Sequence, residues 1–402
     1  MMSAKTLPST ASPFEYQPRT RLVFGPGCSS RVGQFACELG ARRVLIVTDP
    51  GIVAAGHVQR VEHALQAAGV GVVIYDRVRE NPTTRDINQC LEMARSAGID
   101  LFVGLGGGSS MDTAKGCNFI YTNGGQMKDY SGVGKAMRPL LPLIAIPTTA
   151  GTGSECQSAA LIAEEHSHQK MACLDPKAAP RVAMLDPELT VSQPPRVTAC
   201  TGIDAIAHAV ETAVTRKRNA LSLMYSHEAF KLAVGGFERV LSHPHDLEAR
   251  GRMLLGAAFA GTAIENSMLG AAHSAANPLT AHFDVVHGQA VGMMLPWVVR
   301  FNASDPTALQ AYAELASAPE IACVSDGLET AVEALVTRLE QLLDLAGFPR
   351  SLAECGVTRS ALPALASEAA RQWTAAFNPR TVSVTDFLEL YEAALEGRAA
   401  VT

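Results

Sequence analysis

Between residues 201 and 288 the chain carries one carboxylate and three imidazoles whose types and spacing suit metal chemistry. Asp204 and His208 are four residues apart, so in a helix they project from one face. His273 and His287 follow, fourteen residues apart. Such a set suits Fe²⁺ or Zn²⁺ and leaves a position for a substrate oxygen. Asp–His pairs at this spacing are also common surface hydrogen bonds, and a histidine among small residues is often a core residue, so these residues alone leave both interpretations open.

Length and composition limit the classes of protein to consider. At 402 residues the chain is long for one hydrophobic core, which predicts two domains. A net charge of −6, spread without runs, gives no basic patch for nucleic acid or for an anionic membrane surface. No apolar stretch approaches the ~18–20 residues that span a bilayer. Residues 1–18 are polar, without the apolar core of a signal peptide, and predict a loose arm.

The cysteines point to a reducing compartment. Their number, nine, is odd, and none forms a Cys-x-x-Cys pair. We therefore expect buried thiols in a cytoplasmic protein, without a disulfide framework or a thiolate zinc site.

The first half of the chain alternates between strand and helix patterns. The β-branched run at 43–49 predicts a strand buried on both faces. Further strands are expected at 20–24, 70–75, 101–105 and 143–147, and helices at 32–39, 58–68 and 84–97. This alternation predicts an α/β, Rossmann-like domain with a parallel sheet and helices on both faces.

Three loops at the carboxyl ends of these strands contain polar or glycine-rich segments. Asp49 ends the strand at 43–49, where an acidic residue accepts the ribose hydroxyls of an adenosine; the alternative is an N-cap for a helix beginning near Ile52. Gly107 and Gly108 let backbone N–H groups approach a diphosphate, or form only a tight turn. We expect Ser109 to cap the following helix, with Asp112 in its first turn. This loop departs from the G-x-G-x-x-G fingerprint, since Ser109 replaces the last glycine.

The third loop follows the strand at 143–147 and is rich in hydroxyls. Thr148, Thr149 and Thr152 lie among glycines, where they can hydrogen-bond phosphate or ribose, or belong to a flexible turn.

Strand patterns end after residue 186, and long Ala/Leu-rich helical patterns follow. Helices are expected at 199–216, 220–241, 247–265 and 328–345. We therefore predict two domains, an α/β nucleotide-binding domain at 1–190 and an all-helical metal-binding domain at 191–402.

Several of these motifs, in this order, resemble the iron-containing (group III) alcohol dehydrogenase family over nearly the whole chain. The matching segments are 20–25, 45–49, 81–83, 106–109, 146–155, 186–190, 201–208 with Glu211, and 378–380. The resemblance implies a nucleotide-binding α/β domain followed by a helical domain that carries the metal.

The resemblance also assigns site residues. It implies that Asp204, His208, His273 and His287 ligate the metal, Fe²⁺ with Zn²⁺ as the alternative. The positions that it implies for the cofactor are Asn81, Gly107, Gly108, Ser109, Thr148, Thr149, Thr152 and Lys170. An aspartate at the position of Asp49 goes with NAD in this family, since a carboxylate repels the 2′-phosphate of NADP.

The implied activity is that of an NAD-dependent alcohol dehydrogenase that moves hydride between an alcohol, or its aldehyde or ketone, and NAD(H), with the metal polarising the substrate oxygen. A hydroxyacid–oxoacid transhydrogenase and a non-redox, lyase-type synthase on the same fold are the alternatives, and a non-catalytic binding protein is the third. A homodimer or higher homo-oligomer is expected.

One position departs from the family pattern. After His273 the family usually has a second histidine where this chain has Asn277. An amide does not titrate near neutral pH. Either the proton leaves by another route, for which His282 is a candidate, or the substrate is not a simple alcohol.

Overall fold

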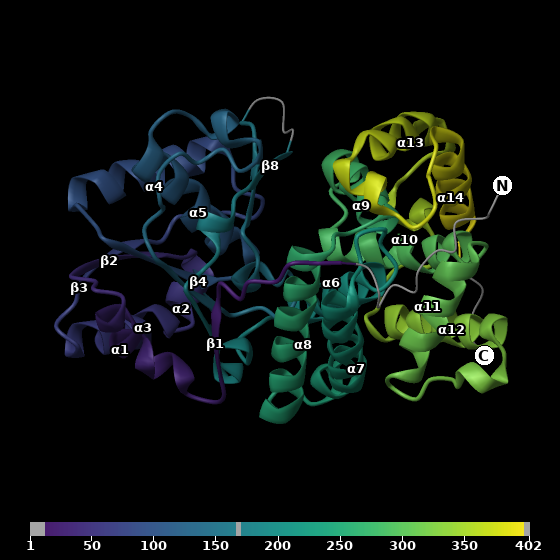
Figure 1. The fold of residues 1–402 in the computed structure, drawn as a ribbon, viewed down its shortest axis with the longest axis horizontal. Helices are drawn as coiled ribbons and strands as arrows, with labels where there is room; N and C mark the ends of the chain where they lie inside the picture. The colour runs from purple at the N-terminus through teal and green to yellow at the C-terminus, as the bar shows by residue number, and fades with distance from the viewer. Residues whose placement is uncertain (1–12, 166–169, 398–402) are drawn as a thin grey trace. The chain divides into compact units, whose positions relative to one another are not determined.

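The computed structural model describes residues 13–165 and 170–397. These form two compact units, one of Gln17–Gln193 and one that begins at Pro194 and includes the described residues before Gln17 (Figure 1). Of the predicted N-terminal arm, residues 1–12 lie outside the described part, and residues 13–18 are exposed without helix or strand.

The first unit is built on a six-stranded parallel sheet with the order β1-β9-β6-β4-β2-β3. Its strands are β1 (Arg21–Phe24), β2 (Arg43–Val47), β3 (Gly71–Tyr75), β4 (Leu101–Gly106), β6 (Leu143–Pro147) and β9 (Val182–Leu185). The predicted parallel sheet is confirmed, and the fully apolar strands β4 and β6 lie in its centre, where both faces are covered.

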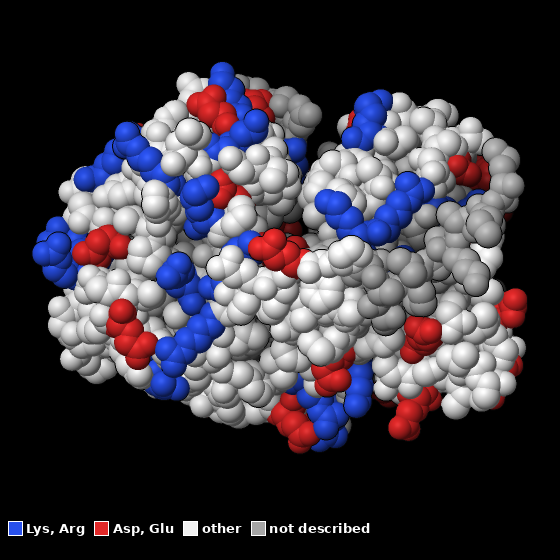
Figure 2. Space-filling model, viewed as in Figure 1, with Lys and Arg blue, Asp and Glu red and all other residues white. Residues whose placement is uncertain are grey.

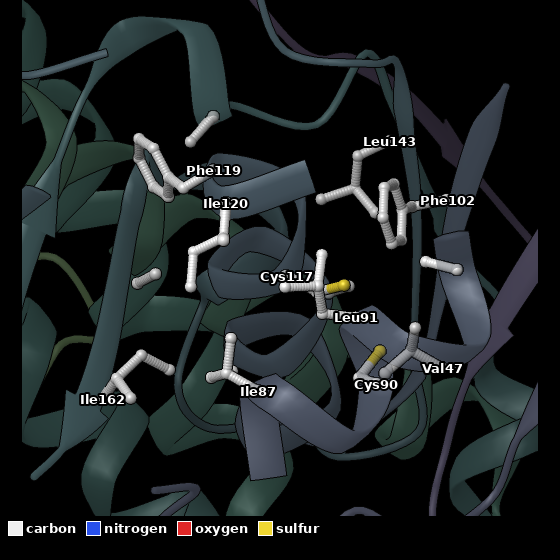
Figure 3. Packing of buried hydrophobic residues seen from close by; sticks show 14 of the residues in the cluster. Val47, Ile87, Cys90, Leu91, Phe102, Cys117, Phe119, Ile120, Leu143 and Ile162 are labelled. Atoms are coloured by element: carbon white, nitrogen blue, oxygen red, sulfur yellow. The ribbon is translucent and has the colours of Figure 1, made fainter. Parts of the chain in front are cut away.

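Helices cover both faces of this sheet because alternate residues of each strand point to opposite sides. Leu45 and Phe102 pack against α4 (Thr84–Ala97) and α5 (Gly108–Asn123), in the cluster drawn in Figure 3. Their neighbours Val44 and Leu101 pack instead against α1 (Val32–Glu38) and α3 (His57–Ala67).

A second, three-stranded sheet was not predicted from the sequence. It has the order β5-β8-β7, with β5 (Gly132–Val133), β7 (Ala159–Ala163) and β8 (Lys170–Leu174). These strands are short, and β7 is mostly alanine, so they carry little strand propensity of their own.

The second unit is helical: no strand occurs in it among the described residues from 194 to 397. Its α-helices are α6 (Pro195–Thr212), α7 (Ala220–Ser242), α8 (Leu247–Asn266), α9 (Ala271–Phe283), α10 (His287–Asn302), α11 (Pro306–Ser317), α12 (Leu328–Leu345), α13 (Leu362–Arg371) and α14 (Val384–Glu396). Three of the predicted long helices match α7, α8 and α12 closely. The helix predicted at 199–216 begins four residues earlier, at Pro195, and ends at Thr212.

The surface mixes both signs of charge. On the face drawn in Figure 2, Lys and Arg are interspersed with Asp and Glu. Among residues 13–165 and 170–397, no helix combines the length and the hydropathy that crossing a bilayer requires.

The nine cysteines are free thiols. Six are buried as predicted, but Cys37 and Cys323 are exposed and Cys355 is half-buried, so the prediction of uniformly buried thiols was wrong for these three.

Candidate metal centre and nucleotide-binding loops

The structure brings the four predicted metal ligands together within the helical unit. Asp204 and His208 lie one turn apart on α6, with Asp204 Oδ1 at 3.5 Å from His208 Nε2. The same oxygen lies 3.5 Å from Nε2 of His273, on the first turn of α9, and 3.9 Å from Nε2 of His287, at the start of α10. We call these four residues the Asp204 cluster.

Small residues allow α6 and α10 to approach closely enough for this arrangement. A Cβ on Gly288 would lie 2.0 Å from the backbone oxygen of Cys200 on α6, so only glycine fits directly after His287. On another side of α6, a Cβ on Gly202 would lie 2.6 Å from the ring of Phe237, so α6 also packs closely against α7. The backbone contact at Gly288 therefore fixes where His287 meets the cluster.

Glu211, one further turn along α6, fixes the orientation of His273. Its Oε2 lies 2.5 Å from His273 Nδ1, and its Oε1 accepts a 2.7 Å hydrogen bond from the backbone N–H of Ala272. Because a carboxylate only accepts, Nδ1 of His273 carries the proton and Nε2 is left with a lone pair that faces Asp204. The sequence motif included Glu211, but its role was not predicted.

A second side chain supports the same helix end. Asn378 Oδ1 accepts from the backbone N–H of Ala271, and Asn378 also exchanges hydrogen bonds with the buried Asn302. Two long-range side chains thus satisfy the first N–H groups of α9, whose N-cap, Gly270, has no side chain.

The electrostatics of the cluster favour a cation. Burial would raise the pKa of the Asp204 carboxyl, but the His208, His273 and His287 rings lower it overall. Burial would lower the pKa of His273, yet Glu211 and Asp204 raise it to about 9. At this pKa the metal-free His273 carries a second proton near neutral pH, and a metal ion bound at Nε2 would replace it. The imidazoles are then neutral, and the two buried carboxylates leave a net charge of −2 that a divalent cation balances.

Two buried polar atoms without hydrogen-bond partners indicate that a metal ion would fit the cluster. Asp204 Oδ1 and His273 Nε2 are buried and have no hydrogen-bond partner among the described residues. Asp204, His208 and His273 offer ligand atoms within 4.8 Å of one another. One carboxylate oxygen and converging imidazole nitrogens form a donor set that suits Fe²⁺ or Zn²⁺.

In the α/β unit, the turn from β4 into α5 meets the hydroxyl-rich loop. A Cβ on Gly107 would lie 3.3 Å from Thr149 Oγ1, and one on Gly108 would lie 2.8 Å from Thr152 Cγ2. Helix α5 begins at Gly108 with Gly107 as its N-cap. The prediction that Ser109 caps this helix was therefore wrong: Ser109 lies inside the first turn, because glycine already adopts the capping conformation.

Asp49 serves as an N-cap and still presents a second oxygen. Its Oδ1 accepts from the backbone N–H groups of Gly51 and Ile52, which confirms the capping alternative. Its Oδ2 takes no hydrogen bond among the described residues and lies 3.4 Å from where a Cβ on Gly106 would be. Capping and ligand contact are therefore compatible at this residue.

The remaining predicted cofactor residues are Thr148, Asn81 and Lys170. Thr148 donates its N–H to Gly106 O at 3.0 Å, and its buried hydroxyl has no partner among the described residues. Asn81 is exposed in the left-handed region, at φ 52°. Next to it, Pro82 O accepts from Ala163, which pairs with Lys170 between β7 and β8.

Asp112 lies within α5, beyond its first turn, so the prediction that it belongs to the first turn was wrong, because the helix begins at Gly108. Its side chain contacts the segment after Thr152. Its Oδ1 accepts from Ser154 Oγ at 3.1 Å, and burial raises its pKa against the opposing effect of Lys115. The buried Lys115, missed from the sequence, donates to Ser154, Gln157 and Ala159. Burial raises the pKa of neighbouring Glu155 to about 7.

The departure at position 277 has a defined partner. Asn277 Nδ2 donates to Gln372 Oε1 at 3.1 Å. His282 is exposed at the end of α9, where it pairs with Glu368 at 2.9 Å. No sequence pattern linked Asn277 to Gln372, which lies 95 residues further along the chain.

Comparisons with known proteins match both halves of the chain. Residues 18–187 match the family described as iron-containing alcohol dehydrogenase, and residues 198–395 match the C-terminal part of the Fe-containing alcohol dehydrogenase family. Alcohol dehydrogenase 4 of Schizosaccharomyces pombe is 34% identical over 98% of this chain and 91% of its own length. Lactaldehyde reductase of Escherichia coli is 34% identical over 92% of this chain and 97% of its own.

Solved structures agree with these matches. A 1,3-propanediol oxidoreductase superimposes with a TM-score of 0.91 at 30% identity, covering 95% of this chain and 99% of that one. An alcohol dehydrogenase from Oenococcus oeni gives 0.90 at 31% identity, covering 95% of this chain and 100% of that one.

Proposed function

Because the chain belongs to the iron-containing alcohol dehydrogenase family, we propose that the Asp204 cluster holds the divalent metal of a hydride transfer between an alcohol and NAD(H). The observation that carries the site assignment is the pair of buried atoms without partners, Asp204 Oδ1 and His273 Nε2, in surroundings of net negative charge. A divalent ion bound there supplies Lewis acidity toward the substrate oxygen. Fe²⁺ is the proposed ion, with Zn²⁺ as the alternative that the same donors accept.

The protein residues orient the ligand atoms of the cluster and exclude water from it. Glu211 keeps the proton of His273 on Nδ1, so that Nε2 stays an acceptor. The buried surroundings exclude water from Asp204, His208 and His273, each of which is about 4% exposed. Exclusion of water strengthens the electrostatic interactions within the site.

We propose that the loops after β2, β4 and β6 bind NAD(H), which supplies the hydride donor and acceptor. Gly107 and Gly108 hold backbone N–H groups at the start of α5, where a diphosphate is stabilised by the helix dipole. The other proposed contacts are Asn81, Ser109, Thr148, Thr149, Thr152 and Lys170. Asp112 orders the loop through Ser154, and Asp49 Oδ2 accepts from the ribose and selects NAD over NADP.

Relatives suggest small substrates. They are named for lactaldehyde, 1,3-propanediol, methanol and choline, so we propose a small alcohol or its aldehyde. The transhydrogenase and synthase alternatives are not favoured, since these relatives are named dehydrogenases and reductases.

We further propose a cytoplasmic homodimer that associates through β1. This strand lies at the edge of the large sheet, with Leu22 37% and Phe24 49% exposed. An exposed edge strand with apolar side chains is a template for pairing with a second copy.

The test is NADH oxidation by protein loaded anaerobically with Fe²⁺, across short aldehydes that are unsubstituted, branched, hydroxylated or acidic. We expect turnover that chelation abolishes and metal restores. Equilibrium dialysis of His208→Ala and His273→Ala should show loss of stoichiometric metal while NADH still binds. Full metal occupancy in both variants would contradict the ligand assignment.

A further inference from the structure

The segment 378–380 contacts two of the helices that carry the Asp204 cluster. Its first residue, Asn378, is 1% exposed, and its Oδ1 accepts from the backbone N–H of Ala271 on α9. Its last residue, Arg380, donates to the backbone oxygen of Phe301 on α10, and Cζ of the guanidinium lies 3.8 Å from the centre of the Phe301 ring. These two helices carry the third and fourth ligands of the cluster.

The end of α6 is fixed to the same part of the chain. Arg216, four residues after α6 ends, donates its backbone N–H to Phe377 O at 2.9 Å. Its side chain donates to Pro379 O at 3.3 Å and to Thr381 Oγ1 at 2.9 Å. Because α6 carries the other two ligands, one short segment is tied to the ends of all three ligand-bearing helices.

Asn378 forms a reciprocal amide pair with Asn302, the last residue of α10. Asn378 Nδ2 donates to Asn302 Oδ1 at 2.7 Å, and Asn302 Nδ2 donates back to Asn378 Oδ1 at 3.1 Å. The second N–H of Asn378 donates to Arg380 O at 2.9 Å. Together with the bond from Ala271, Asn378 uses both acceptor positions and both donors of its amide. A buried amide bonded at every position is held in one orientation.

Asn378 and Glu211 approach the first turn of α9 together. A Cβ on Gly270, the N-cap, would lie 3.0 Å from Asn378 Oδ1 and 3.1 Å from Glu211 Oε1. These two oxygens accept from successive backbone N–H groups, those of Ala271 and Ala272, at 3.3 and 2.7 Å. Since an amide carries no charge, Asn378 binds this helix end without repelling the Glu211 carboxylate.

We propose that Asn378, held by Asn302, is a positioning residue of the Asp204 cluster. It fixes the first turn of α9 against the end of α10, and thereby fixes His273 Nε2 relative to the other ligand atoms. Loss of the pair leaves this turn free to shift, so the ligand atoms converge less well on one ion. This inference rests on the proposed function, because it takes the Asp204 cluster as a metal site.

The experiment compares wild type with Asn378→Leu, Asn302→Leu and the double variant, in the absence of substrate. Competition with a chromophoric chelator gives the Zn²⁺ affinity, and the visible absorption of Co²⁺-loaded protein reports the geometry of the ligands. We expect Asn378→Leu to bind Zn²⁺ about tenfold more weakly, the lower end of the effect of residues that orient a metal ligand, and to shift the Co²⁺ bands. Asn302→Leu should change both in the same direction. The double variant should lose no more affinity than Asn378→Leu alone, because the two residues act as one pair.

Asn219→Leu is the matched control. Asn219 is also a buried asparagine of the helical unit, but it caps α7 and donates to Asn266 O. This variant should lower the free energy of unfolding and leave the Zn²⁺ affinity and the Co²⁺ spectrum as in wild type. The same result for Asn378→Leu and Asn302→Leu would show a purely structural role and overturn the inference, and Asn302→Leu decides alone if Asn378→Leu does not fold. Absence of Co²⁺ binding by wild type would instead contradict the proposed metal site, and the inference with it.

Discussion

At the scale of single residues, the Glu211 carboxylate accepts hydrogen bonds from both the first turn of α9 and the imidazole of His273. It accepts from the N–H of Ala272 and from Nδ1 of His273. Both bonds direct Nε2 of His273 toward Asp204.

Glu211→Gln tests this role. The amide group turned toward His273 would donate, so the imidazole would move its proton to Nε2 and lose its lone pair there. We expect metal affinity to fall about 10–100-fold, as for other residues that orient a metal ligand. The measurement is competition for Zn²⁺ with a chromophoric chelator. Glu368→Gln, which alters the exposed pair with His282, is the control, and equal affinity in both variants would refute the role of Glu211.

Asp49→Ser tests nucleotide choice. Serine retains the N-cap and removes the charge, so stability should change little while NADPH is no longer repelled. Two unit charges 4 Å apart repel by about 4 kcal/mol at an effective dielectric of 20, so we expect the NADPH/NADH ratio of kcat/KM to rise at least about tenfold.

Asp100→Ser is the matched control, because Asp100 accepts from backbone N–H groups at the opposite end of β2. If Asp49→Ser left the coenzyme ratio at the wild-type value, Asp49 would be a helix cap alone.

Residue types and spacing identified the Asp204 cluster because its chemistry is unusual and its motif is local. Gln372 could not be found in this way. Its contact with Asn277 depends on how α9 packs against α13, and glutamine at a helix end has no distinctive pattern.

At the scale of elements, the segment 152–159 is held by buried polar groups. Lys115 on α5 donates to three of its backbone oxygens, and Glu155 lies 2% exposed within it. Such a segment is ordered by specific hydrogen bonds more than by apolar packing.

Burial of Glu155 makes stability depend on pH. Its pKa rises from 4.5 to about 7 in the folded protein. Between these values the unfolded chain releases a proton that the folded chain retains. The protonated Glu155 therefore contributes fully to the free energy of unfolding below pH 4.5, and this contribution is lost as pH rises through 7. Between pH 4.5 and pH 8 we expect the free energy of unfolding of Glu155→Gln to rise by on the order of 3 kcal/mol relative to that of wild type. Urea unfolding measures this difference. The control is Glu92→Gln, at an exposed site on α4, whose free energy of unfolding should follow the same pH dependence as wild type. The same pH dependence in Glu155→Gln would mean that the Glu155 carboxyl ionises normally.

Gly108→Ala tests the close approach of the two loops that we propose bind the nucleotide. The added Cβ would lie 2.8 Å from Thr152 Cγ2, so the loops must separate. We expect NADH to bind about tenfold more weakly, and Thr152→Ser in the same chain to restore part of the affinity, because it removes that methyl group. Gly235→Ala, with no neighbour nearer than 3.9 Å, should leave NADH affinity unchanged. A Gly108→Ala variant of wild-type affinity would mean that the loops bind no diphosphate.

Long helices and fully apolar strands were predictable because their hydrophobic periodicity is local and extends over many residues. β7, β8 and β9 were not predicted. Strand β9 pairs with β6 and β1, which lie far from it in sequence. Strands β7 and β8 are consecutive and pair with each other, and this pairing overrides weak propensities such as that of the Ala-rich β7.

At the scale of the whole molecule, association through β1 is testable with one side chain. We expect Phe24→Lys to yield monomers in light scattering, because a charge at the edge opposes strand pairing. Met224→Lys, at an exposed apolar side chain of α7, should leave the mass unchanged. If Met224→Lys were monomeric and Phe24→Lys dimeric, the interface would lie on the helices.

The position of β1 has a consequence for biosynthesis. This strand leaves the ribosome before the other strands of its sheet, yet its partner β9 lies about 160 residues later in the chain. At ~5–20 residues per second, β1 waits roughly 10–30 s before its hydrogen bonds can form. During that interval β2, β3, β4 and β6 can assemble without it, so the nascent chain passes through a stage with an unpaired apolar strand, when holding chaperones would have most to bind.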